Sequence, residues 1–171
     1  MSTIQPHPDA NVRSETFSVA RSNALCRHCG ESNNLIALVV PDNHEILEAN
    51  EDEDANPHPP PDVWQRANAN AVLFYVDYLP DGVRDRLQQI SPFYRMGYSA
   101  VTLNSYWANH CEHCGTLLDD HELHCEPDGA FVPSNESAAA AIQLSSVQAP
   151  FHAAAAGYAP APEFFRFARR P

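Results

Sequence analysis

Two matched cysteine pairs are the residues of this sequence best suited to chemistry. Cys26 and Cys29 stand in the segment CRHCG, and Cys111 and Cys114 stand in CEHCG. The two-residue spacing lets a tight turn aim both sulfurs at one ion, and the glycine that follows supplies a left-handed backbone without a Cβ clash. One such pair is weak evidence. Two pairs predict a tetrahedral four-thiolate site for a single structural Zn²⁺.

The predicted zinc site is closed. Four thiolates fill the coordination sphere and leave no position for water or substrate, which favours a structural role over catalysis. The pairs are separated by 81 residues. A metal ion that closes so long a loop is expected to stabilise the fold by constraining the unfolded chain.

Other readings of the cysteines and histidines explain less. The fifth cysteine, Cys125, is expected to be a buried small hydrophobe. A local site from Cys111, Cys114, His121 and Cys125 is an alternative, but it leaves the first pair unexplained. HELHC at 121–125 lacks the second histidine of a zincin, and neither pair has the helical setting of a redox dithiol. We therefore expect no enzyme.

Residues 105–126, SYWANHCEHCGTLLDDHELHCE, resemble a bacterial zinc-ribbon family with the pattern SYWxNxCxxCG, then Gly-Asp and LHxE. The first pair, followed by LIALVVP, is similar to the same family. The resemblance covers residues 24–133 with gaps at 41–62 and in the helix region, and Asp119 replaces the glycine of the pattern. It implies zinc and a ribbon-like fold, and it implies no reaction. The matching residues are Ser105, Tyr106, Trp107, Asn109, Cys111, Cys114, Gly115, Asp120, Leu123, His124, Glu126, Gly129, Phe131 and Pro133.

The elements that must position these residues are predicted from hydrophobic patterns. Residues 35–40, 71–79, 98–107 and 142–147 are typical of strands, and 82–90 of a helix capped by Asp81. A short helical turn capped by Ser134 is expected after them. The prediction is an α+β fold with a zinc-ribbon-like small antiparallel sheet, one or two short helices and disordered tails. Its parts are a flexible segment 1–23, a domain 24–150 with an acidic, proline-rich insertion 41–62, and an Ala/Pro-rich tail 151–171. We expect Tyr106, Trp107, Leu117, Leu123 and Phe131 to pack around the second pair.

The net charge of −12 restricts the class of partner. Residues 24–133 hold 18 acidic side chains and five arginines, and such a surface repels phosphate backbones. Tyr94, Tyr98, Tyr106 and Trp107 keep base stacking open as an alternative. The first 23 residues lack a secretory signal and the apolar runs are too short for a membrane span, so we expect a cytoplasmic location.

Composition and motifs together predict a non-catalytic, zinc-stabilised protein that binds another macromolecule, most simply a protein. The alternatives are a nucleic-acid-associated zinc-ribbon accessory factor and a thiol/zinc redox switch in which Cys125 exchanges with a zinc ligand.

Overall fold

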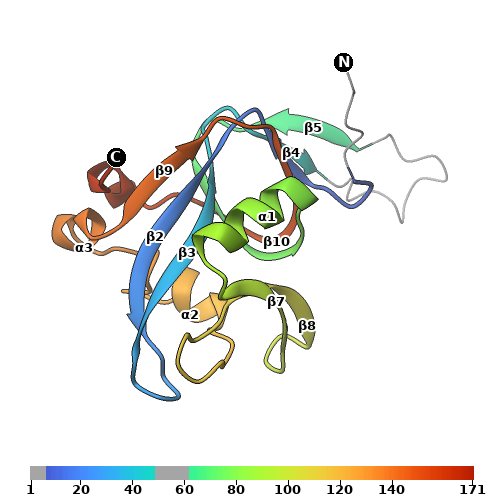
Figure 1. Ribbon diagram of the computed structural model, residues 1–171. Coiled ribbons are helices and arrows are strands. Elements are labelled where there is room, and N and C mark those ends of the chain that lie inside the picture. The colour runs from blue at the N-terminus through green and yellow to red at the C-terminus, as the bar shows by residue number, and fades with distance from the viewer. Residues whose placement is uncertain (1–6, 49–61) are drawn as a thin grey trace.

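The computed structural model describes residues 7–48 and 62–171 (Figure 1). The strands in these residues are β1 (Val12–Ser14), β2 (Phe17–Leu25), β3 (Ser32–Val40), β4 (Glu45–Glu48), β5 (Val63–Arg66), β6 (Ala71–Tyr78), β7 (Tyr94–Ser99), β8 (Asn104–Asn109), β9 (Gln143–Val147) and β10 (Phe151–Pro160). The helices are α1 (Asp81–Ile90), α2 (Asp120–His124) and α3 (Glu136–Ala140), followed by a 3₁₀ helix at Glu163–Phe167.

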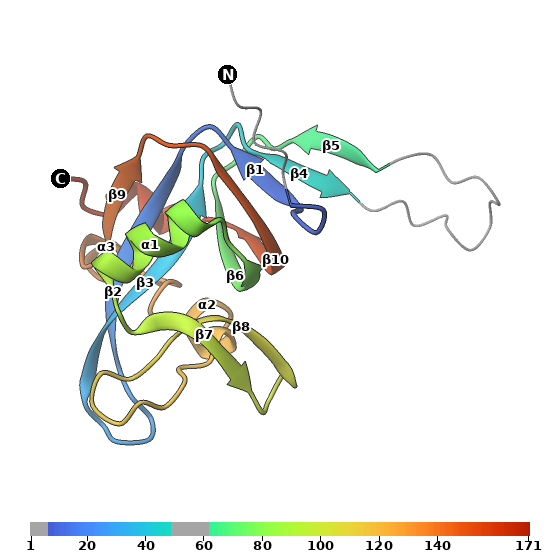
Figure 2. The same cartoon turned by 45° about the vertical axis from the view of Figure 1, so that its right-hand side comes forward.

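The strands form one antiparallel sheet. Their order is β5-β4-β1-β10-β6-β3-β2-β9, and the β7–β8 hairpin joins it where Trp107 pairs with Val76 of β6. Figures 1 and 2 show that the sheet bends strongly, with α1 lying across it and the β4–β5 hairpin extending from one end.

The two faces of β3 pack in different clusters. Ile36, Leu38 and Val40 lie in the larger cluster together with residues of α1, and Leu35, Ala37 and Val39 lie in the second cluster with Leu123 of α2. A strand buried on both faces reads as an unbroken apolar run, which explains LIALVV.

The expectation of a small zinc-ribbon sheet with disordered tails is wrong. β2 pairs with β3 from Ser18 to Leu25, and β10 lies between β1 and β6. The alanines of β10 suit this central place because Ala153 and Ala155 pack into the core, and the absence of a side chain on Gly157 makes room for the Phe74 ring. The Ala-rich segment, whose composition resembles a low-complexity tail, therefore forms the closely packed strand β10.

The C-terminal residues cover the sheet edge at β9. Leu144 donates to the carbonyl of Arg169, and the Arg169 N–H donates to the carbonyl of Ile142. Because an open strand edge is a template for aggregation, this pairing protects β9.

Three of the predicted strands are confirmed as β3, β6 and β9, but the predicted strand at 98–107 is wrong. The chain turns at residues 100–103, so that this stretch supplies the end of β7 and most of β8. α1 begins at Asp81, with Pro80 rather than Asp81 in the N-cap position, and Asn135 rather than Ser134 caps α3. Within the predicted insertion, Glu45–Glu48 form β4, and residues 49–61 lie outside the described residues.

Candidate metal centre

Two turns at hairpin ends carry the cysteine pairs. Residues 26–31 connect β2 to β3, and residues 111–116 connect His110 to Leu117, which form an isolated antiparallel bridge. Both views show these turns side by side, at the free end of the β2–β3 hairpin (Figures 1 and 2). Strands far apart in sequence therefore bring the two pairs together.

The two turns have the same local geometry. The Gly30 N–H donates to the carbonyl of Cys26 at 2.7 Å, and the Gly115 N–H donates to that of Cys111 at 3.0 Å. The φ angles of these glycines are +79° and +76°. The predicted left-handed conformation of both glycines is confirmed, and glycine adopts it without the steric cost other residues incur.

The four sulfurs lie at distances that suit a tetrahedral ion. All four Sγ atoms are within 4.8 Å of one another. Cys26 and Cys114 Sγ are 3.7 Å apart, and Cys29 and Cys111 Sγ are 3.5 Å apart. Zinc with Zn–S bonds of about 2.3 Å requires S···S separations of about 3.8 Å. The four cysteines named from the sequence are thus together and could hold a metal ion.

Backbone N–H groups favour thiolate at the second turn. Burial by itself would raise the pKa of Cys111, but the N–H groups of Cys114 and His113, which point at its Sγ, and the neighbouring thiols lower it to about 6. The pKa of Cys29 is raised to about 12, because burial and the adjacent thiols outweigh a backbone N–H of Glu31 that lowers it. Cys111 therefore carries negative charge more readily than Cys29, and a bound divalent cation would favour the thiolate form of its ligands.

Two buried asparagines join the turns. The Asn109 amide donates to the Ile36 carbonyl at 3.0 Å and accepts from the Ile36 N–H at 2.9 Å, as a paired strand would. Asn33 accepts from the Glu112 N–H at 2.7 Å and donates to the Glu31 carbonyl. Sequence reasoning missed the role of both. Asn109 belongs to the SYWxN pattern and was the available signal, whereas nothing local marks Asn33.

Helix α2 holds the first turn from outside. Arg27 forms ion pairs with Glu122 at 2.9 Å and with Glu126 at 2.7 Å. The side chain of Asp119 caps the helix by accepting from His121 N. The departure from the family pattern at Asp119 therefore places an N-cap where a glycine was expected.

The inner side of α2 is fixed by the buried side chain of Asp120 and by the half-buried ring of His124, whose Nδ1 is buried. Asp120 accepts a 2.8 Å hydrogen bond from the N–H of Tyr75, a residue whose φ of +50° turns this N–H toward it. His124 stacks between Phe74 and Phe131, with ring centroids 5.3 and 5.1 Å away. Position and orientation of α2, and hence of Glu122 and Glu126, follow from these contacts.

The burial of the other named residues is mixed. Of the five residues expected to pack around the second pair, Leu123 and Phe131 lie in the cluster that contains Cys111. Trp107 instead packs with Tyr94 in the cluster that contains α1, Tyr106 is buried against Tyr75, and Leu117 is half-buried. The prediction that Cys125 is buried is wrong, because it is exposed at the end of α2. Among the described residues, the side chains whose ligand atoms lie close enough to share one metal ion include neither His121 nor Cys125. This is evidence against a local site formed by Cys111, Cys114, His121 and Cys125.

None of the helices in residues 7–48 and 62–171 has the length and apolar character needed to cross a bilayer. No family model, curated protein or solved structure matches the chain. The resemblance to a zinc-ribbon family therefore stays a prediction that rests on the residues around the second turn.

Proposed function

We propose that this chain is a non-catalytic, zinc-stabilised β protein that binds another protein through the β7–β8 hairpin. The observation that carries the proposal is a group of exposed apolar side chains on this hairpin. Met96, Tyr98, Val101 and Leu103 are 41%, 61%, 81% and 71% exposed. They are four of the seven large hydrophobic residues exposed in the described part of the chain.

The charge of the hairpin also fits a protein partner. Between residues 94 and 109 the only charged side chain is Arg95, in a chain whose net charge is −12. Apolar side chains gathered on an otherwise acidic surface are typical of protein-binding sites, where a few aromatic and aliphatic anchors supply most of the affinity. Leu103 also holds a φ of +57°, and such strain in a non-glycine residue is more common at functional sites.

The metal centre supports the hairpin through packing. A Cβ on Gly97 of β7 would lie 2.5 Å from Nε2 of His110 and 2.9 Å from Leu117, the two residues that bracket the second cysteine turn. The second turn therefore lies directly against β7. Zinc at the four cysteines would fix this turn and with it the direction in which the hairpin extends.

Base stacking finds less support than protein binding. Tyr94, Tyr106 and Trp107 are buried and only Tyr98 of the four aromatic residues is exposed. The acidic charge adds repulsion from a phosphate backbone. We keep the cytoplasm as the proposed location, because paired thiolates remain reduced and available to zinc there.

A thiol/zinc switch is a second candidate because Cys29 and Cys114 are exposed whereas Cys26 and Cys111 are buried. Hydrogen peroxide could take two electrons from two thiolates, forming one S–S bond and, with two protons from the solvent, two water molecules, and Zn²⁺ would be released. Mass spectrometry after mild peroxide treatment tests this candidate. A single reproducible disulfide that forms together with zinc release supports it, and scattered oxidation with zinc retained contradicts it.

The binding proposal is tested by site-specific photo-crosslinking in cells of the source organism. A photoreactive residue at Val101 is expected to give one discrete adduct that is absent when the same residue replaces the exposed Gln148, outside the hairpin. Leu103→Asp should abolish the Val101 adduct while zinc content and circular dichroism stay unchanged. Equal adducts at both positions, or an adduct that survives Leu103→Asp, would contradict the assigned surface.

A further inference from the structure

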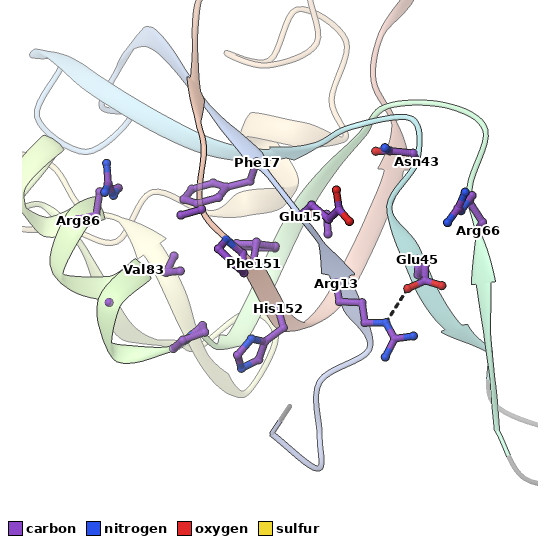
Figure 3. A pocket seen from close by; sticks show the side chains of 15 residues that line it. Arg13, Glu15, Phe17, Asn43, Glu45, Arg66, Val83, Arg86, Phe151 and His152 are labelled. Carbon is purple, nitrogen blue, oxygen red and sulfur yellow. Dashed lines mark hydrogen bonds and ion pairs between the residues drawn. The ribbon is translucent and has the colours of Figure 1, made fainter. Parts of the chain in front are cut away.

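A cavity of about 800 Å³ lies apart from the metal centre, between α1, strands β1, β4 and β5, and the start of β10 (Figure 3). None of the four zinc-ligand candidates lines it. Its volume lies within the roughly 300–1,000 Å³ that small-molecule sites occupy.

The middle of the cavity is apolar. Phe17 and Phe151 are each 2% exposed, and their ring centroids are 4.9 Å apart. Figure 3 shows these rings between α1, which contributes Val83, and β1. Gly82 in the first turn of α1 also lines the cavity, and a Cβ placed on it would meet no atom within 4 Å. Although little of either ring is exposed, both line the cavity, and the open space beside Gly82 gives an apolar ligand body of modest size room next to them.

A row of charges crosses three neighbouring strands at one end. Arg13 of β1 pairs in register with Glu45 of β4, and Glu45 pairs in register with Arg66 of β5. Residues directly opposite in antiparallel strands share a face of the sheet. The Glu45 carboxylate lies 2.7 Å from Nε of Arg13, whereas Arg66 has no ion pair with any described residue. Glu45 is thus flanked by an arginine on each neighbouring strand and is ion-paired with Arg13.

The orientation of Arg13 is fixed before any ligand arrives. Its guanidinium carbon lies 4.1 Å from the centroid of the Trp64 ring, and its Nε is held by Glu45. Its two Nη atoms form no hydrogen bond with the residues that the structure describes. Glu45 occupies only Nε of Arg13. The two Nη atoms of Arg13 and the guanidinium of Arg66 are therefore available to bind an anion.

We propose that this cavity binds a small organic monocarboxylate, with its carboxylate on Arg66 and the Nη atoms of Arg13 and its apolar body against Phe17 and Phe151. The charged side chains that line the cavity favour a ligand with a single negative charge. Arg13, Arg66 and Arg86 face Glu15 and Glu45, which leaves one net positive charge. The remaining titratable residue of the lining is His152, and burial, with the nearby His7, lowers its pKa, so it is neutral near pH 7. A phosphate dianion would leave an uncompensated charge there.

The probe for the test is 3-phenylpropanoate, added to the zinc-loaded full-length chain and followed through arginine Nε–H signals in ¹H–¹⁵N spectra. All ten basic residues are arginine, so the side-chain region of the spectrum holds no lysine signals. We expect saturable shifts at Arg13 and Arg66 within about 10 mM probe, the range in which ligands of this size bind. The neutral 3-phenylpropanamide should bind about tenfold more weakly or worse, and acetate and inorganic phosphate should not saturate the signals.

Matched variants separate this site from general charge effects. Arg66→Gln should weaken binding about tenfold, whereas Glu45→Gln should strengthen it, since it removes a negative charge next to the bound carboxylate. Arg84→Gln changes charge equally on α1 but at a residue that pairs with Asp81 and does not line the cavity, so it should leave binding unchanged. Gly82→Phe should block the apolar space. Backbone spectra that match the parent chain confirm folding of each variant.

Three outcomes would overturn the proposal: no saturable shift in this range, equal binding of carboxylate and amide, or equal loss in Arg66→Gln and Arg84→Gln. None of them bears on the hairpin as a protein-binding surface, because the cavity and the hairpin share no residue.

Discussion

Asn109 stands at the end of β8, and its amide forms both of its hydrogen bonds with the backbone of Ile36 in β3. Asn109→Ala would leave a buried N–H and a buried carbonyl of Ile36 without partners, and each such loss costs about 1–3 kcal/mol. We expect the free energy of unfolding of the zinc-loaded protein to fall by roughly 2–4 kcal/mol, measured by denaturant titration. The control is Asn104→Ala on the same strand, where an exposed amide donates only to the Thr102 carbonyl. Similar losses in both variants would show that the Ile36 contact is not what matters.

The cysteine ligands could be predicted because each pair and its glycine form a complete ligand motif within five consecutive residues. The roles of Asn33 and Asn109 could not, although Asn109 stands in the SYWxN pattern, because each amide acquires its role only from a partner far away along the chain. The pairing that creates the role spans more than 70 residues of sequence, from Ile36 to Asn109. Residue types alone do not encode such a contact.

Asp120 and His124 on helix α2 give the protein two opposing dependences of stability on pH. Burial, reinforced by Asp119 and opposed by the Tyr75 N–H, raises the pKa of Asp120 from 3.8 to about 7. The folded chain therefore keeps a proton that the unfolded chain has lost, and stability falls as the pH rises from about 4 to 7. Burial lowers the pKa of His124 from 6.5 to about 3, so stability falls as the pH drops below 6.5. The two trends nearly cancel between pH 4 and 6.5.

Asp120→Asn should expose the first of these trends. Asparagine keeps an oxygen that can accept from Tyr75 but carries no proton to lose. Relative to the parent chain, the variant should gain about 2 kcal/mol of stability between pH 5.5 and 8, since one pKa unit is worth about 1.4 kcal/mol. Thermal unfolding of both proteins with excess zinc at the two pH values measures this difference. A difference that does not change with pH would mean that Asp120 is already ionised in the folded protein at pH 5.5.

His124→Phe should expose the second trend. The ring stack with Phe74 and Phe131 is kept, and the buried Nδ1, which has no partner among the described residues, is removed. The variant should gain about 1.4 kcal/mol over the parent chain when the pH falls from 7.5 to 5.5, because only the parent's unfolded state takes up a proton at this position. The same pair of unfolding measurements provides the value. A gain in the opposite direction would show that His124 is protonated in the folded protein.

Whole elements were predictable where hydrophobic pattern and length agreed, and not where packing decided. LIALVV at 35–40 and AVLFYV at 71–76 are read correctly as strands because they are short apolar runs rich in β-branched or aromatic residues. The alanines of 153–156 suit a tail, a helix or a crowded strand equally well, and only the neighbours β1 and β6 select the strand. The turn at 100–103 contains neither glycine nor proline, so no residue marks it as the place where β7 returns as β8.

For the molecule as a whole, one metal ion would tie β2 and β3 to the region that follows β8. Elemental analysis of the purified protein is expected to give one zinc per chain. Cys26→Ser and Cys111→Ser should each abolish zinc binding, because both pairs contribute to one tetrahedral site. Zinc retained in Cys26→Ser would contradict the shared site and return attention to ligands near the second turn.

Chelation of the metal ion should change the structure of the β7–β8 hairpin before that of the rest of the sheet. Trp107 is 7% exposed and lies on β8, three residues before His110, whose ring lies against β7 at Gly97. Chelation should therefore shift Trp107 fluorescence to longer wavelength, measured in a Trp64→Phe background so that Trp107 alone reports. The same treatment should leave amide exchange slow at the centre of the sheet, since Leu38 and Leu73, which pair across β3 and β6, lie in the apolar cluster that contains no cysteine. Loss of protection everywhere at once would instead mean that the zinc centre is needed for the entire fold, because four metal–sulfur bonds can hold a structure that its own core cannot.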